Sequence, residues 1–298
     1  MTGAAPSLPA SATGLFSGRS RSERRRIWVD RLMTLVASLA AASLLISLLT
    51  IIAFVVVSGL PYIDEQFLTK ETIGYGEGGA LAAMLGSLQM VPLATLIGAP
   101  IGILGGIYLA EARPSRISYT IRVATEVLAG LPSVVIGVFA FTFLVAPRGS
   151  YSALAGSVAL AVIMIPIVAR STEEIVRLVP GSVREAALAL GIPVWKTVLR
   201  VIVRTALAGI LATVMLAVAR IAGETAPLIL TAVGNQATNV GDFLSPMDSL
   251  PTFIWYASGQ PSDLLVGQAW AAALILMLFV LIANILVRGR TAGRRRTN

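Results

Sequence analysis

The chain alternates between long apolar runs and short polar segments. A helix that spans a bilayer needs about 20 mainly apolar residues, and six runs of this sequence reach or approach that length. Helices suit such runs because a backbone inside lipid must satisfy its own hydrogen bonds. The hydropathy pattern therefore predicts an all-α, polytopic membrane protein with six transmembrane helices, at about 32–57, 78–110, 127–146, 151–169, 205–233 and 264–287.

The polar segments divide the chain into four parts. Residues 1–31 join an Ala-, Ser-, Gly- and Pro-rich start to a basic run, which is typical of a disordered tail. Residues 32–77 comprise an anchor helix and an outer loop. The anchor's apolar run is longer than the roughly 7–15 residues of a signal peptide, so we expect it to be retained. Residues 78–287 form the main transmembrane domain, and 288–298 are a second basic tail.

Charge along the chain predicts its orientation. Twenty of the 23 Lys and Arg residues fall in the two tails, the loop 111–126 and the loop 170–204. The other loops carry only Lys70 and Arg148, and Arg220 lies within a predicted span. Because positively charged loops stay on the cytoplasmic side, we expect a multi-pass protein with both termini in the cytoplasm.

Composition narrows the chemistry that the chain can perform. The 298 residues are 56% hydrophobic and 13% charged, whereas a soluble domain carries about a quarter charged residues. Cys and His are both absent, which excludes disulfides, thiol chemistry, His general bases and Cys/His metal sites. We therefore expect no catalytic residues and no metal. The net charge is +8, but the arginines flank the apolar runs and do not form a basic patch. The charge therefore does not indicate nucleic-acid binding.

The segment 170–204 is charged and rich in helix-forming residues. Its Pro-Gly-Ser start and the spacing from Ser182 to Glu185 predict a capping box at the beginning of a short helix. Gly191 can adopt the left-handed conformation that ends a helix, and Pro193 suits the first position of a second one. The pattern predicts two short helices that meet at an angle. The alternative is a solvated loop with no partner.

Four residues of this segment carry a resemblance to a known family. Glu185, Ala186 and Ala187, followed after three residues by Gly191, resemble the EAA signature of permease subunits of bacterial ABC importers. The resemblance implies a type I ABC importer permease fold. In that fold the short helix that carries Glu185, Ala186 and Ala187 is a coupling helix, which docks on an ATPase subunit. The family signature later has a proline where this chain has Arg204, which leaves open whether the second short helix continues into the fifth span.

The fifth span contains two charged residues. Arg220 and Glu224 are four residues apart, which predicts that they share one helix face. A charge at the centre of a bilayer costs about 2.5–3.5 kcal/mol, so such residues face protein or water. They either neutralise each other or line the path of an anion, with the Thr225 hydroxyl beside them. Pro227 is expected to kink or end the helix just past the pair.

The sequence around this pair extends the resemblance to the phosphate importer permeases. The stretches ARIAGETAPLILTA, LAGLPSVVIG and SLPTFIWYASGQP carry the likeness. It implies that the chain lies in the bacterial inner membrane and that its substrate is inorganic phosphate. It also implies three kinds of partner: a second permease subunit in a heterodimer, two ATPase subunits and an extracytoplasmic binding protein. The chain has no G-x-x-x-x-G-K-[ST] phosphate loop. We therefore expect no cofactor here, with ATP and Mg²⁺ bound by the ATPase.

Two further residues flank the predicted third span. Glu126 is interpreted as a helix-start residue, with a gate as the alternative, and Ser133 either lines the solute path or bonds its own helix. LPTFIWYA is too short to cross a bilayer and predicts a short helix at the membrane interface. Other functions stay open: a permease for sulfate, molybdate or an amino acid, or a membrane scaffold. An intramembrane enzyme is disfavoured because an Arg–Glu pair supplies neither nucleophile nor metal ligands.

Overall fold

The computed structural model describes residues 21–73, 77–233 and 240–293 and consists of two compact units, Met1–Phe54 and Val55–Asn298. The predicted disordered tail lies mostly outside the described residues, as do the last five residues of the second tail. The described part of the first unit belongs to the helix α1, Arg21–Gly59, whose last residues lie in the second unit. Leu39, Leu44 and Ile46 on it are exposed, as expected for a helix whose solvent is lipid.

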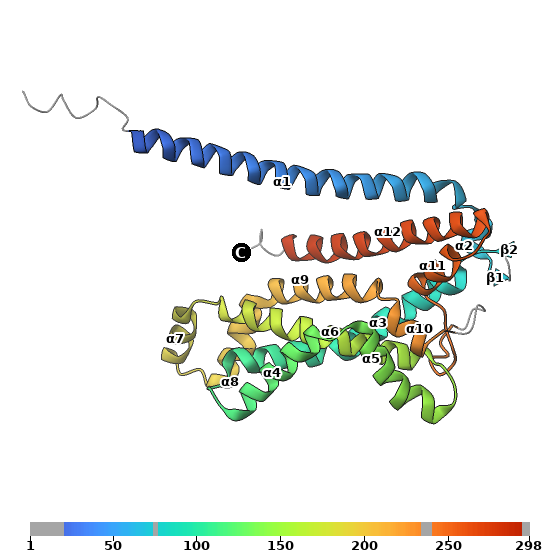
Figure 1. The fold of residues 1–298 in the computed structure, drawn as a ribbon. Helices are drawn as coiled ribbons and strands as arrows, with labels where there is room; N and C mark the ends of the chain where they lie inside the picture. Colours follow the sequence, from blue (N-terminus) through green and yellow to red (C-terminus); the bar gives the residue numbers. More distant parts are fainter. Residues whose placement is uncertain (1–20, 74–76, 234–239, 294–298) are drawn as a thin grey trace, which may run out of the picture. The chain divides into compact units, whose positions relative to one another are not determined.

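The second unit is almost entirely helical, and Figure 1 labels its elements. A two-residue antiparallel pairing, Thr72 with Gly78 and Ile73 with Glu77, adds a small hairpin to the predicted all-α fold. The elements in chain order are η1 Leu60–Tyr62, α2 Glu65–Thr69, β1 Thr72–Ile73, β2 Glu77–Gly78, α3 Leu81–Glu111, α4 Arg116–Gly130, α5 Ser133–Ala140, η2 Phe141–Val145, η3 Ala146–Arg148, α6 Ala153–Arg177, α7 Gly181–Ala189, α8 Val194–Lys196, η4 Thr197–Ile202, α9 Val203–Ala222, α10 Ala226–Thr231, α11 Leu250–Ser258 and α12 Asp263–Gly293.

Five helices in the described part of the chain are long and apolar enough to span a membrane, and a bent helix pair supplies a sixth span if it is counted as one. The third span, predicted at 127–146, is not one continuous helix. The chain there consists of α4 and the helical segment 133–148, which meet at 104°. Leu131 is extended because the residue before a proline avoids the helical region. This part of the chain is therefore a bent pair of helices, of which the first, α4, is amphipathic.

Two other predicted spans have different ends. The fourth span continues to Arg177 as α6, well past the predicted end near residue 169. The fifth starts earlier, because α8, η4 and α9 form one helical segment, Val194–Ala222. It also stops before the predicted end at residue 233, and α10 follows as a separate helix. The charged segment predicted to begin at residue 170 therefore begins as the end of a spanning helix.

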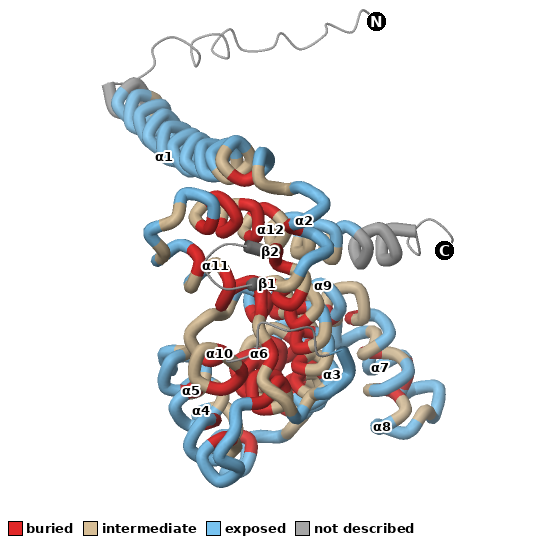
Figure 2. Tube along the Cα trace, turned by 90° about the vertical axis from the view of Figure 1, so that its right-hand side faces the viewer, coloured by how far each residue is buried: buried red, intermediate tan, exposed pale blue. Residues whose placement is uncertain are grey.

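The core of the second unit is the contact between α3 and α6, where buried residues are concentrated (Figure 2). Glycines make the close approach possible, because they have no side chain to separate the two backbones. A Cβ on Gly102 would lie 2.7 Å from Val168 Cβ, and one on Gly106 would lie 2.4 Å from the Ala169 carbonyl oxygen. The two helices are thus in backbone contact around Gly102 and Gly106 and form one packed body.

Adjacent glycines on α3 allow a sharp test of this packing. A Cβ at Gly105 would meet only Ala169 Cβ, at 3.9 Å. We expect Gly106→Ala to lower the melting temperature of the detergent-solubilised protein, because overpacking costs about 1–3 kcal/mol. Gly105→Ala should leave it unchanged or raise it, since Ala is the better helix former by about 1 kcal/mol. Equal melting temperatures for the two variants would contradict backbone contact at this point.

The short helix predicted from LPTFIWYA is present as α11, and it is integrated into the protein core. Leu250 and Phe253 are buried against α12 and α3, while Trp255 is exposed. Ser249 and Thr252 form a capping box at its start. The Ser87 hydroxyl accepts a hydrogen bond of 2.8 Å from the backbone N–H of Leu250, which ties α11 to α3.

Asp248, which precedes this cap, lies outside the spans. Burial raises its pKa, although hydrogen bonds from Thr252 and the Ser249 N–H oppose the shift. A raised folded-state pKa means that stability is present in acid and is lost as the pH rises through that value. We expect Asp248→Asn, which keeps the acceptor oxygen, to raise the melting temperature at pH 8 but not at pH 4. A larger gain at pH 4 than at pH 8 would contradict this.

Candidate functional site

The segment between α6 and α9 forms an elbow, defined here as residues 178–202. Its first helix, α7, is present as predicted, but it begins at Gly181, its cap is Pro180 and no side chain caps it. The predicted capping box of Ser182 and Glu185 is therefore wrong. Gly191 has φ +75°, and its N–H donates to the Leu188 carbonyl at 2.9 Å. The predicted left-handed helix end is thus confirmed.

The second half of the elbow leads directly into the fifth span. Pro193 is the cap of α8 and lies one position before the helix, not at its first residue. From Val194 the chain continues through the π-helix η4 into α9. The question left open by Arg204, which replaces the family proline, is thereby answered. The elbow and α9 are thus joined without an intervening loop.

The EAA residues point in two directions. Glu185 and Ala186 are exposed, and they can meet a partner as the sequence predicts. Ala187 is only 5% exposed, because it packs within the elbow, where its carbonyl accepts from the Ile192 N–H at 3.2 Å. The prediction that all three residues present themselves to a partner is therefore wrong for Ala187. The elbow also carries exposed apolar side chains, namely Leu178, Leu190, Val194 and Trp195.

Arg220 and Glu224 form an ion pair, with 3.8 Å between Arg220 Nε and Glu224 Oε1. They do not share a helix face, because α9 ends at Ala222 and Gly223 begins the turn that carries Glu224. Pro227 is the second residue of α10, so it does not end α9 as predicted. The Arg220 side chain is 61% exposed and that of Glu224 is 17% exposed. The pair therefore lies at a helix end, with the guanidinium directed outward.

The other predicted pathway residues lie on neighbouring elements. Thr225 is half-buried and precedes α10, and Ser133 is half-buried at the start of α5. The helices α5 and α10 are in close contact, since a Cβ on Gly137 would be 2.8 Å from Pro227 Cα. Among the described residues, however, the ion pair of Arg220 involves Glu224 alone, and no bond joins it to Ser133. The role of Ser133 remains a prediction.

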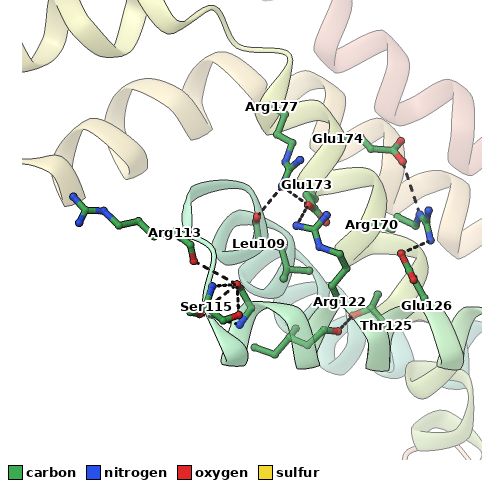
Figure 3. A network of polar contacts seen from close by, with 12 residues as sticks. Leu109, Arg113, Ser115, Arg122, Thr125, Glu126, Arg170, Glu173, Glu174 and Arg177 are labelled. Atoms are coloured by element: carbon green, nitrogen blue, oxygen red, sulfur yellow. Dashed lines mark hydrogen bonds and ion pairs between the residues drawn. The ribbon is translucent and has the colours of Figure 1, made fainter.

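A charged cluster that the sequence did not predict joins α4 to α6 (Figure 3). Glu173 on α6 is 9% exposed, and its Oε1 lies 2.8 Å from Nη2 of both Arg122 on α4 and Arg177. Neither contact is an aligned hydrogen bond, so charge holds the carboxylate in place. The cluster surrounds a cavity of about 220 Å³, which is lined by Leu109, Arg122, Thr125, Glu126, Arg170, Glu173, Glu174 and Arg177.

Glu126 belongs to this cluster and is not a helix-start residue as predicted. It lies near the end of α4 and faces Arg170 Nη1 at 3.6 Å. Arg170 also lies 3.9 Å from Glu174. One signal was present in the sequence: Arg170 with Glu174, and Glu173 with Arg177, are spaced four apart, which favours a helix that continues past residue 169. The contacts with α4 had no such signal.

The arrangement of spans, broken third span and elbow is the fold of ABC importer transmembrane subunits. A bacterial alginate ABC transporter, solved with its pentasaccharide-bound periplasmic protein, matches with a TM-score of 0.64 and 16% identity, over 90% of this chain and 97% of its own. The inward-facing MetNI methionine ABC transporter matches with a TM-score of 0.60 and 19% identity, over 71% and 94%. At these identities the likeness concerns the fold alone.

Sequence comparison identifies the family. Residues 102–290 match the binding-protein-dependent transport system inner membrane component, and the chain belongs to this family. It is 42% identical to the phosphate transport system permease protein PstA of Pasteurella multocida, over 87% of this chain and 93% of that protein. It is 35% identical to the probable phosphate transport system permease protein PstA of Methanocaldococcus jannaschii, over 88% and 94%. The chain is thus a multi-pass inner membrane permease.

Proposed function

We propose that this chain is the permease subunit of an ATP-driven importer that moves inorganic phosphate across the bacterial cytoplasmic membrane by alternating access. The observation that carries the proposal is its 42% identity, over 87% of its length, to a relative named for phosphate transport. Relatives from Xylella fastidiosa, 45% identical over 76% of this chain, carry the same name. The site supports an anion as substrate through Arg220.

The exposure of Arg220 supports a subunit interface at this face. A guanidinium in contact with lipid is costly, by about 2.5–3.5 kcal/mol on insertion scales, yet this side chain is 61% exposed on the single chain. Protein or water must therefore cover it. A second permease subunit of the PstC type, in a heterodimer with this one, would supply that cover, and the solute would pass between the two.

The chemistry of the pair suits transient binding of phosphate. A guanidinium stays charged and presents a planar set of donors that matches an oxyanion. Glu224, 3.8 Å from the Arg220 Nε, offsets part of that charge and so limits how tightly an anion is held. The Thr225 and Ser133 hydroxyls are assigned as further polar groups on the path. Binding that is strong enough for capture and weak enough for release is what a transport site requires.

The elbow lies at the other end of the same helical segment and is assigned to ATPase docking. Glu185 and Ala186 are exposed and would contact the ATPase, and Gly191 adopts the left-handed conformation of the turn after α7. Ala187 is buried and packs α7 against the rest of the elbow. Two copies of a separate ATPase subunit would bind ATP and Mg²⁺. An extracytoplasmic binding protein would deliver phosphate on the opposite side of the membrane, where the loops with few Lys and Arg residues lie. Both chain termini would be cytoplasmic.

Uptake by the reconstituted complex tests the proposal. Proteoliposomes would contain this chain, the companion permease and the ATPase, with the binding protein outside and ATP inside. We expect ATP-dependent uptake of labelled phosphate that excess sulfate, molybdate or amino acids do not reduce. Preferred uptake of one of those solutes would contradict phosphate as the substrate. A complex without ATP-dependent uptake of any of them would contradict the transport function itself.

A further inference from the structure

The helix α7 is held to the rest of the chain on two sides. On one side Ala187 is buried against the start of η4, and the Thr197 hydroxyl donates to the Ile192 carbonyl. On the other side Arg184 Nη2 donates a charge-assisted hydrogen bond to Glu111 Oε1 at the last residue of α3. The two residues are 73 positions apart. The EAA helix is therefore bonded directly to a spanning helix that does not adjoin it in sequence.

The end of α3 is an electrostatically suitable place for this bond. The last carbonyls of a helix lack intrahelical partners and carry partial negative charge, and Glu111 adds a largely buried carboxylate there. Arg184 compensates the carboxylate, and Arg177 Nη2 donates to the Leu109 carbonyl at 3.3 Å. Two arginines, one from the end of α6 and one from α7, thus neutralise the same helix end.

Contacts continue from α3 to the proposed solute path. The glycine packing at Gly102 and Gly106 joins α3 to α6, and Glu173 joins α6 to α4 through Arg122. Helix α4 leads through the 104° bend into the segment that begins with α5, and α5 packs on α10 at Pro227, three residues after Glu224. Each link is a direct contact, so a displacement of α3 has a physical route to the Arg220–Glu224 pair.

We propose that Arg184 and Glu111 are positioning residues that make α3 move with the elbow when the ATPase moves it. The inference rests on the proposed function. Without this bond, α7 would be held by η4 and by its chain connections, and part of its movement would not reach α3. The ATPase would still dock on Glu185 and Ala186 and hydrolyse ATP, but fewer phosphate ions would be transported per ATP. The measurement that tests this contact route is the coupling between the two residues in single and double variants.

Charge reversal in the complete reconstituted transporter tests the pair. We expect Arg184→Glu alone and Glu111→Arg alone each to lower phosphate transported per ATP by about fivefold or more, the lower range of couplings between distant sites. The amount of ATPase that co-purifies should not change. The double variant Arg184→Glu with Glu111→Arg should restore most of the ratio. Arg116→Glu, a charge reversal at the exposed arginine that begins α4, is the matched control and should retain the ratio.

A covalent link provides a second, independent measurement. The chain contains no cysteine, so Arg184→Cys with Glu111→Cys gives two unique thiols. Joining them with a short bifunctional thiol reagent should raise the uptake-to-ATP ratio of this double variant, because the link replaces the lost bond. A link that blocks uptake would overturn the inference, since it would show that the two residues must separate during transport.

The outcomes separate this inference from the function beneath it. Unaltered ratios in the single reversals, or no recovery in the double reversal, would overturn the positioning role while the unaltered complex still transports phosphate. Loss of ATPase co-purification in the single reversals would also overturn it, by showing a docking role instead. An unaltered complex without ATP-driven phosphate uptake would overturn the proposed function and this inference together.

Discussion

Replacement of Arg220 by glutamine is expected to reduce phosphate uptake about tenfold to hundredfold while the complex still assembles and binds ATP. The reason is the loss of a charge-assisted hydrogen-bond donor to the anion, which is worth about 1.5–3 kcal/mol. The neighbouring Glu224, 3.8 Å away, would then be left as an uncompensated negative charge that repels the substrate. Initial rates of labelled phosphate uptake in proteoliposomes provide the measurement.

The double variant Arg220→Gln with Glu224→Gln separates these two effects. If repulsion by Glu224 contributes, the double variant should take up phosphate faster than Arg220→Gln alone. Arg148→Gln is a suitable control, because that exposed arginine is the last residue of the helical segment 133–148, where its side chain donates to the Leu244 carbonyl at 3.3 Å. Normal uptake by Arg220→Gln would exclude the pair from the solute path and favour mutual neutralisation as its whole role.

Replacement of Gly191 by valine is expected to separate the ATPase from the permease. Gly191 has φ +75°, a conformation that costs an L-residue about 1–2 kcal/mol and is a marked outlier for β-branched residues. The chain would relieve the strain by changing the turn after α7, which displaces Glu185 and Ala186 from the docking geometry. We expect ATPase co-purification to fall about tenfold, with uptake falling in parallel.

Two substitutions control for this change. Gly191→Asn should retain most of the ATPase, because Asn adopts the left-handed region readily. Gly181→Ala should be neutral, since nothing lies within 4 Å of a Cβ there and its φ is not positive. Equal retention of the ATPase by Gly191→Val and Gly181→Ala would show that the turn geometry is not needed for docking.

The sequence predicted the elements whose signals are local. The apolar runs located the spans, because length and hydropathy decide whether a segment can cross a bilayer. Gly191 marked a helix end because its missing side chain permits one conformation that others avoid. The errors also have local causes: Pro132 divides the third span, and Gly223 ends α9 before Glu224. Both breakers are visible in the sequence, but the hydropathy of the surrounding runs concealed their effect.

The predicted helix cap and the predicted docking residues show a second limit of prediction from the sequence. The spacing of Ser182 and Glu185 fits a capping box, yet Pro180 is the residue at the helix start. Ala187 belongs to the EAA stretch, but it is buried inside the elbow. Which face of a short helix is covered depends on where the chain returns, and here it returns through η4. Residue spacing alone does not contain that information.

By itself, the sequence determined that this is a polytopic helical membrane protein, with a charged segment between two spans and an Arg and a Glu four residues apart in the fifth apolar run. These properties follow from hydropathy, charge and backbone preference within short segments. Only the tertiary structure decided that Glu173 faces Arg122, that Glu111 faces Arg184 and that α3 lies in backbone contact with α6. The physical reason is that a charged side chain or a glycine face acquires its partner when distant helices pack, and that packing is a property of the whole fold.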